Sequence, residues 1–359
     1  MTPRCARSVA LAIFSLAAVG IAAANGCAAF RSPRAASAGY CAVPGLPATY
    51  YLFAPQQITT HDIEGRATVT SVPSLSPPFL TAVDSSHGSA VVVSAERWTI
   101  IDLTDAGLRH LAWQTPAAPT HLALTDSRLA VLTQNRVGLY ELASGQALWG
   151  PEVLDAWLAG HELGRLAAVV PHPEMRGALL LICHAKSGWG AAAPAIVTMD
   201  FSAGEPRKTQ QLQITEFTRL ERVTSDGAAI YLAGVHERQQ PGIGDQPGQL
   251  TQTLLVQRLD SARATLETLV REDLSTYAVA VRVDELAVSY DLAVVIGLGD
   301  DLRVYDTSGA TNQLRSPLVF SDRLPHSEFS AAPIARTKVL LLDRRSGSTR
   351  TIDLSAPAR

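Results

Sequence analysis

The clearest pattern of apolar and polar positions lies in residues 135–149. Val137 and Leu139 would share one face of an extended chain, and Tyr140 and Leu142 the other, because successive side chains of a strand point to opposite faces. A short polar turn that contains glycine follows, and a second apolar run ends the stretch. An alternating run, a turn with glycine and a second run are typical of a β-hairpin.

The same hairpin pattern occurs at seven places, each with an apolar run that ends in an acidic residue and a short turn. Glycine is present in six of the seven turns, and it readily adopts the positive φ of a tight hairpin. The acidic positions are Asp62, Asp102, Glu141, Asp200, Asp260, Asp306 and Asp343. Their separations are 40, 39, 59, 60, 46 and 37 residues. A period near 40 with occasional insertions is typical of a β-propeller.

Apolar runs before these turns predict the inner part of each blade. The expected third strands are 98–101, 137–140, 196–199, 254–259, 302–305 and 339–342, and the expected second strands are 90–93, 129–132, 178–183, 229–233 and 292–296. With an inner strand upstream and an outer strand after the turn, each blade has four strands. We therefore expect an all-β, seven-bladed β-propeller of four-stranded antiparallel blades, with six or eight blades as alternatives.

The two ends of the propeller and its helix content follow from the same pattern. The first blade begins near Thr49 and lacks an inner strand of its own, so a strand from the C-terminal end would close the ring. Closure matters because an open ring leaves sheet edges unpaired. Only residues 153–163 have the pattern of a short helix.

Residues 135–149 also resemble the repeat of PQQ-like and WD40-like propellers, which places an acidic residue, a Ser-Gly or Thr-Gly turn and a tryptophan in succession. Glu141, Ser144, Gly145 and Trp149 occupy these places here, and Trp113 occupies the last of them in the second blade. The resemblance implies the architecture. Proteins with this fold range from quinoprotein dehydrogenases to outer-membrane assembly lipoproteins, so the fold does not select an activity.

The N-terminus has the pattern of a secretory signal. Arg4 and Arg7 precede an almost wholly apolar run of 17 residues, 8–24, which ends in three alanines. Basic residues, an apolar run and small residues in this order predict a cleaved signal peptide over residues 1–27. An uncleaved membrane anchor is the competing interpretation, although the run is at the short limit for a span.

Residues 24–27, Ala-Asn-Gly-Cys, resemble the lipobox of bacterial lipoproteins. Gly26 and Cys27 match that motif, whereas it usually has Leu at Ala24 and a small residue at Asn25. The resemblance implies lipidation of Cys27, and plain export is the alternative. Residues 28–48, rich in Ala, Ser, Gly and Pro, would then form a flexible tether before a propeller domain over residues 49–359.

Composition narrows the class of partner. Apolar residues make up 47% of the 359 residues, which is enough for a sizeable core. The net charge of −3 gives no electrostatic footprint for nucleic acid. After the signal, Cys41 and Cys183 remain. An exported protein permits a disulfide between them, but Cys183 lies in an apolar run and fits better as a small core residue.

Three insertions would lie on one face of the propeller, where the loops between second and third strands meet the links between blades. They are residues 150–164, 184–194 and 237–250. Binding residues concentrate on loops held by a rigid scaffold, although these loops are equally well explained as variable surface segments. The candidate binding residues in them are Trp157, His161, His184 and Trp189.

Enzyme chemistry has weak support in the sequence. Histidines at 161, 172 and 184 have no spacing that imposes a metal site, so we expect no metal. Nucleophile elbows, zinc-protease helices and phosphate loops are absent from the sequence. Quinoprotein dehydrogenases carry adjacent paired cysteines, which this chain lacks, and we expect no cofactor.

We therefore expect a non-catalytic, monomeric, bacterial propeller that serves as a protein- or polymer-binding scaffold in the cell envelope. It would be periplasmic or anchored to the outer membrane as a lipoprotein, with secretion as the alternative, and would contact the membrane only through its N-terminus. One alternative function is a hydrolase or lyase acting at the central channel, which would need histidines and carboxylates at the channel mouth. Another is an outer-membrane assembly factor, which would need an apolar groove between blades.

Overall fold

The computed structural model describes residues 41–355 with gaps. The described residues are 41–45, 49–54, 56–61, 67–72, 80–84, 88–93, 98–103, 108–111, 119–125, 127–134, 136–160, 166–183, 194–202, 206–225, 229–240, 249–260, 263–274, 281–297, 301–308, 318–323, 329–343, 346 and 348–355. In this part of the chain, 27 strands and one helix are present.

The strands form seven sheets. The first three sheets contain β1 (Cys41–Gly45), β2 (Thr49–Ala54), β3 (Gln57–His61) and β4 (Ala67–Ser71); β5 (Leu80–Asp84), β6 (Ser89–Val93), β7 (Trp98–Asp102) and β8 (Leu108–Leu111); and β9 (His121–Thr125), β10 (Arg128–Thr133), β11 (Arg136–Glu141) and β12 (Ala147–Trp149). The helix, α2 (Pro151–Gly160), follows the third sheet.

The remaining sheets follow in the same way. They contain β13 (Leu166–Pro171), β14 (Ala178–Cys183), β15 (Ala195–Asp200) and β16 (Arg207–Gln213); β17 (Arg219–Ser225), β18 (Ile230–Gln240), β19 (Gln249–Asp260) and β20 (Thr265–Asp273); β21 (Val283–Ser289), β22 (Leu292–Gly297), β23 (Asp301–Asp306) and β24 (Leu318–Arg323); and β25 (Phe329–Ala335), β26 (Lys338–Asp343) and β27 (Thr349–Asp353).

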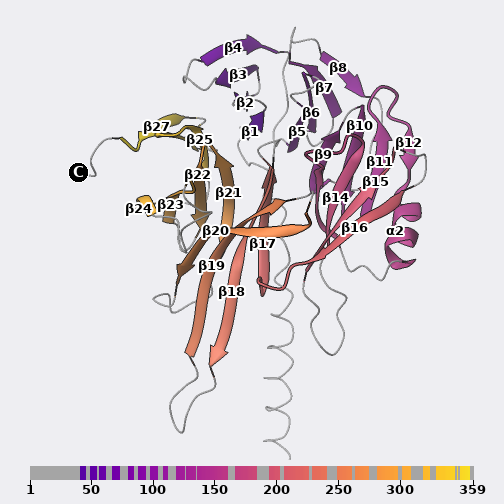
Figure 1. The fold of residues 1–359 in the computed structure, drawn as a ribbon. Helices are drawn as coiled ribbons and strands as arrows, with labels where there is room; N and C mark the ends of the chain where they lie inside the picture. Colours follow the sequence, from indigo (N-terminus) through magenta and orange to yellow (C-terminus); the bar gives the residue numbers. More distant parts are fainter. Residues whose placement is uncertain are drawn as a thin grey trace, which may run out of the picture. The chain divides into compact units, whose positions relative to one another are not determined.

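Each sheet is an antiparallel meander of strands that are consecutive in the chain, and Figure 1 colours them in that order from indigo to yellow. The first strands of neighbouring sheets contact each other in the order β1, β5, β9, β13, β17, β21 and β25, and β25 contacts β1. These contacts close a ring of seven sheets. The prediction of an all-β, seven-bladed propeller is confirmed.

The closure of the ring differs from the prediction. The first sheet has its own inner strand, because β1 pairs with β2 from Cys41 opposite Phe53 to Gly45 opposite Thr49. Residues 41–45 of the segment expected to be a tether are therefore a strand. The last sheet has three strands, β25 to β27, so residues 339–342 lie in a middle strand, and among the described residues no C-terminal strand joins the first sheet.

The second and third strands form the core. All six residues of β14 are buried, and so are four of the five in β6, whereas β4 and β27 are mostly exposed. The reason is that neighbouring sheets cover both faces of a blade near the axis, which favours continuous apolar runs. Cys183 is one of these residues. Its thiol is buried and free, and burial raises its pKa to about 12. Cys183 is therefore a small core residue, as the sequence predicted.

The repeated acidic residue closes the turn after the third strand. Asp200, Asp260, Asp306 and Asp343 each accept a backbone N–H two or three residues further on, at 2.8–3.2 Å. This bond is the one with which aspartate mimics a backbone turn. The N–H of Ser202 lowers the pKa of Asp200. In the hairpin at residues 135–149, Gly145 has φ 71°, as its turn requires.

Candidate functional site

The end of the propeller where first strands begin and second strands finish carries the insertions. Its largest feature is the hairpin of β18 and β19, which have 11 and 12 residues and project side by side in Figure 1. The inner strand β17 starts at Arg219, opposite Val235, but β18 and β19 stay paired to Gln240 and Gln249. We call residues 236–240 and 249–253 the arm.

The arm corrects the prediction of a loop over residues 237–250. Residues 237–240 and 249–250 are paired strand, and residues 241–248 lie outside the described part of the chain. The side chains along the arm are polar at His236, Glu237 and Arg238, so no alternation of apolar residues marked them as strand. Backbone pairing that continues from the core of the sheet holds them extended.

The insertion between the third and fourth sheets forms α2. Pro151 suits the first turn of a helix, where its missing N–H is not needed. Leu154 and Leu158, four residues apart, are buried in the core cluster of the two sheets. Arg136, the first residue of β11, pairs with Asp155 at 2.5 Å and with Glu152 at 3.6 Å. The predicted short helix is therefore present, two residues earlier than expected.

The candidate binding residue Trp157 lies on α2. Its ring packs against the core cluster, and its Nε1 donates a hydrogen bond to the carbonyl oxygen of Pro206 at 3.1 Å. Trp157 therefore fixes the helix to the segment before β16. His161, His184, Trp189 and Cys27 lie outside the described residues, as does Trp113.

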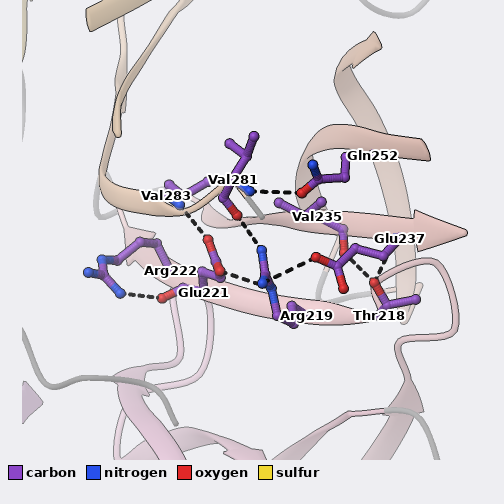
Figure 2. Close-up of polar contacts among 9 residues, drawn as sticks. All are labelled: Thr218, Arg219, Glu221, Arg222, Val235, Glu237, Gln252, Val281 and Val283. Atoms are coloured by element: carbon purple, nitrogen blue, oxygen red, sulfur yellow. Dashed lines mark hydrogen bonds and ion pairs between the residues drawn. The ribbon is translucent and has the colours of Figure 1, made fainter. Parts of the chain in front are cut away.

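A network of charged side chains lies at the base of the arm, between the fifth and sixth sheets (Figure 2). It begins with a β-bulge in β17, where the register shifts between Leu220 and Arg222 and leaves Glu221 as the extra residue. A Cβ on Gly234, across from the bulge, would lie 2.1 Å from the carbonyl oxygen of Arg219. Only glycine allows this approach.

The beginning of β21 has the same construction. Its register shifts between Val283 and Glu285, and the residue opposite Val283 is Gly297, with φ +133°. A Cβ on Gly297 would lie 2.3 Å from the carbonyl oxygen of Arg282. The fifth and sixth sheets therefore present their bulges, with Glu221 and Asp284, at the same end.

Side chains of β17 bind the backbone that begins β21. Arg219 donates to the carbonyl oxygen of Val281, and Glu221 accepts from the N–H of Val283. Arg222 donates through Nε to the carbonyl oxygen of Asp284 at 2.6 Å. Figure 2 shows Arg219 and Glu221 reaching the segment of Val281 and Val283. Charged side chains thus supply hydrogen bonds that a continuous sheet would take from backbone.

The arm is anchored in the same network. Arg219 forms ion pairs with Glu221 at 3.1 Å and with Glu237, on the arm, at 3.2 Å. The hydroxyl of Thr218 accepts the N–H of Glu237 at 2.7 Å. Gln252, fully buried on the other strand of the arm, accepts the N–H of Val281 at 2.8 Å. The base of the arm therefore contacts both sheets.

Burial dominates the electrostatics of this network. It raises the pKa of Glu221 against the opposite effect of the nearby arginines, and it lowers the pKa of Arg222. His121, the first residue of β9, has its pKa lowered to about 4 by burial and by the charge of Arg222. The histidine is therefore neutral at pH 7.

A second network joins the fifth and sixth sheets further out. Arg303 and Tyr305, on β23, both donate to the carboxylate of Glu272 on β20. Burial, followed by the bond to Glu272, raises the pKa of Tyr305. Glu285, on β21, accepts a hydrogen bond from Ser330 on β25. These contacts hold neighbouring sheets together.

Within the described ranges, no group of three or more His, Cys, Asp or Glu side chains is arranged to hold a metal ion. The described ranges contain no helix that is long and apolar enough to cross a membrane.

Sequence reasoning missed the charged network. Its one local signal is the charged run Arg-Leu-Glu-Arg at residues 219–222, at the start of the inner strand β17. The inner strand β13, by comparison, begins with the apolar run Leu-Ala-Ala-Val-Val. The hydrogen-bond partners lie 62 residues away in the chain, and only folding brings them together.

Comparison with known proteins agrees on the fold. No protein-family model matches the chain, and no curated protein matches it. The β-propeller domain of Cps50 (Swd1) from Myceliophteria thermophila covers 88% of this chain and 97% of its own, with a TM-score of 0.58 and 11% identity. The fold is that of a WD40-like β-propeller.

Two further propellers support this result. Hsv2 of Kluyveromyces lactis covers 88% of this chain and 93% of its own, with a TM-score of 0.54 and 10% identity. Hsv2 of Kluyveromyces marxianus covers 88% and 92%, with a TM-score of 0.51 and 10% identity. At these identities the likeness to WD40-like propellers establishes the fold alone.

Proposed function

We propose that this propeller is a non-catalytic, exported scaffold of the bacterial cell envelope that binds a protein or polymer partner. The observation that carries the proposal is the arm, which projects beyond β17 and is fixed at its base by Arg219, Thr218 and Gln252. A pre-ordered projection binds at a lower entropic cost than a loop that must first be ordered.

The rest of the same face supports the proposal. Helix α2 is joined to Arg136, the first residue of β11, by two ion pairs. The arm and α2 thus give one end of the propeller two ordered insertions. In propellers and other rigid folds, binding residues are concentrated on such insertions.

The location in the envelope rests on the sequence. The basic and apolar N-terminal segment, followed by Gly26 and Cys27, supports export and attachment through a lipid on Cys27. In that arrangement the propeller meets the membrane only through its N-terminus, and the arm remains available to a partner.

The enzyme alternative, which needs histidine and carboxylates at the channel, has less support. His121, Glu221 and Glu285 are groups of this kind, and each interacts electrostatically with Arg222. However, Glu221 accepts the N–H of Val283 and pairs with Arg219, and Glu285 accepts from Ser330. A general acid or base must reach the substrate, and these carboxylates are engaged in holding strands together.

The assembly-factor alternative needs a continuous apolar surface. The exposed large apolar side chains of the described residues are Val69, Leu148, Val153, Leu318 and Val319. They lie on four separate elements, β4, β12, α2 and β24. Scattered exposed apolar residues are normal for a protein surface, and they lend this alternative little support.

The test is a pull-down from native envelope with three proteins: wild type, Cys27→Ser, and a variant whose residues 238–251 are replaced by a two-residue turn. Wild type is expected in the membrane fraction with one stoichiometric partner. Cys27→Ser is expected in the soluble fraction, and the arm variant is expected to stay on the membrane without the partner. Retention of the partner by the arm variant would contradict the proposal, as would a soluble wild type.

A further inference from the structure

The seventh sheet has one strand fewer than the others. Each of the first six sheets has four strands, and the fourth strand pairs with the third. Among the described residues, the seventh sheet contains β25, β26 and β27. Because β25 contacts the first strands β21 and β1, it is itself the first strand of its sheet. The position with no described strand is therefore the fourth, at the outer edge beside β27.

A backbone hydrogen bond marks β27 as a third strand. In the sixth sheet, Thr307, just after the third strand, donates its N–H to the carbonyl oxygen of Asp291, just before the second strand, at 2.7 Å. The second, third and fourth sheets have the same bond. In the seventh sheet, Leu354, just after β27, donates to Thr337, just before β26, at 2.7 Å. Third strands of the other sheets are paired on both edges, whereas the described residues pair β27 with β26 alone.

The outer edge of β27 has a defined row of backbone groups. Ser348, just before β27, accepts a backbone N–H from the end of β26 at 2.9 Å, and Leu354 donates to the residue that precedes β26. The backbone groups of these two residues therefore face β26. Alternate residues of an antiparallel strand direct both backbone groups to the same side. The residues that direct theirs to the outer edge are Thr349, Thr351 and Asp353.

The surroundings of β27 hold one of its faces and leave the edge uncovered by described residues. Arg350 pairs with Asp322 on β24, at 3.3 Å, and Ile352 packs against the core cluster shared with the sixth sheet. The third strands β7 and β15 are mostly buried, whereas β27 has no buried residue. The sixth sheet thus fixes β27 in an extended conformation beside the uncovered edge.

The chemistry of this edge selects a polypeptide. Alternating N–H and C=O groups are a template for another extended chain, and in strand addition main-chain hydrogen bonds supply affinity while alternate side chains supply specificity. A polysaccharide has no such backbone. Two copies of this chain that paired only through their five-residue β27 strands would bury far less than the roughly 1,200 Å² of a stable interface. A segment of a partner that is already bound elsewhere does not need this area, because its effective concentration is high.

We propose that the outer edge of β27 receives an extended segment of the protein partner, which pairs antiparallel with Thr349–Asp353 as the fourth strand of the seventh sheet. Fourth strands in this protein have from three residues, in β12, to nine, in β20, so a segment of about five residues fits. An apolar side chain of the segment beside Ile352 would extend the cluster at that face. The inference rests on the proposed function, since it names the class of partner as a protein with an extended segment.

The test measures amide hydrogen exchange of the full chain by NMR. The probe is a peptide with the sequence of residues 66–72, which includes β4, a five-residue fourth strand that pairs with β3 without a register shift. In the control peptide, Thr70 and Ser71 are replaced by proline. Because the two positions are adjacent, one of the two lost N–H groups faces β27 in either register.

The free protein is expected to exchange the amides of Thr349, Thr351 and Asp353 rapidly and those of Arg350 and Ile352 slowly. At about ten times its Kd, the probe peptide is expected to slow the first three about tenfold, and the proline peptide to leave them unchanged. Binding without this protection would overturn the proposal, as would no binding at about 10 mM peptide. Slow exchange of the first three amides in the free protein would show that a segment of this chain or a second copy already covers the edge, which also overturns it.

A matched pair of variants tests the edge from the side of the protein. Thr351→Pro removes the N–H at the centre of the edge, and a strand tolerates proline where its N–H faces solvent. Thr351→Ala keeps that N–H. The proline variant is expected to bind the probe peptide at least about tenfold more weakly, the size of one hydrogen bond, and the alanine variant to bind as wild type does. Equal affinities would overturn the proposal.

The exchange rates of the wild type decide the proposal even if Thr351→Pro does not fold. Neither experiment needs the arm or the native partner. A failure here is therefore distinct from a failure of the pull-down, which tests the arm and the attachment through Cys27.

Discussion

At the scale of single residues, two glycines explain why the charged network forms where it does. Gly234 and Gly297 each lie opposite a bulge, with a backbone carbonyl closer than any Cβ tolerates. The bulge turns Glu221 toward the next sheet, where it accepts the N–H of Val283. The position of the charged side chains thus depends on a residue that has no side chain.

Replacing Gly234 with alanine therefore tests the bulge. The added Cβ would lie 2.1 Å from a backbone oxygen, so β17 or β18 must shift, at a cost of about 2 kcal/mol or more. Gly160→Ala is the control, because nothing lies within 4 Å of its Cβ position. Urea unfolding monitored by circular dichroism measures both variants. Equal stability of the two variants would show that the approach at Gly234 is not strained.

His121 makes stability depend on pH in a defined direction. Its pKa is about 4 in the folded protein, against 6.5 for an ordinary histidine. Above pH 6.5 both states are neutral at this residue. Between pH 6.5 and 4 the unfolded state binds the proton and the folded state does not, so stability falls by up to about 1.4 kcal/mol per pH unit. His121→Gln is expected to be less sensitive to acid over this range.

The measurement is the free energy of unfolding of both proteins at several pH values from 7 to 4.5. Other groups contribute equally to both, so the difference between wild type and His121→Gln isolates the histidine. Parallel curves would contradict the lowered pKa of His121.

At the scale of elements, the strands divide into those that the sequence predicts and those that it does not. Second and third strands such as β10 and β14 are covered on both faces and appear as continuous apolar runs. The inner strand β17 (Arg219–Ser225) was predicted from the polar turn that follows it, although Leu220 is its one buried residue. The arm was missed, because its polar residues pair through backbone and show no apolar alternation.

Helix α2 provides the prediction at this scale. Leu154→Ala removes a side chain with 0% exposure from the cluster shared by the third and fourth sheets, and a cost of about 2–4 kcal/mol is expected. Val153→Ala, at a side chain with 47% exposure, is expected to change stability by less than about 0.5 kcal/mol. Thermal unfolding of both variants makes the comparison. Similar melting temperatures would show that α2 is not fixed by Leu154.

At the scale of the whole molecule, the repeated turn was the informative feature. Asp200, Asp260, Asp306 and Asp343 each close a turn by binding the backbone, so their spacing reported the number of sheets. No comparable sequence pattern indicated how the ring closes. Its closing contact joins residues almost 300 positions apart and involves no repeated motif, and a pattern of neighbours in sequence cannot reveal it.

The closure has a mechanical consequence. The first and last sheets share no strand among the described residues, and β1 meets β25 through packing between separate sheets. A propeller whose last blade borrows a strand must break a ladder of backbone hydrogen bonds before its ends can separate. Here a pull on the first and last sheets meets no such ladder among the described residues. The ring is therefore expected to open at this junction under tension while the blades remain folded.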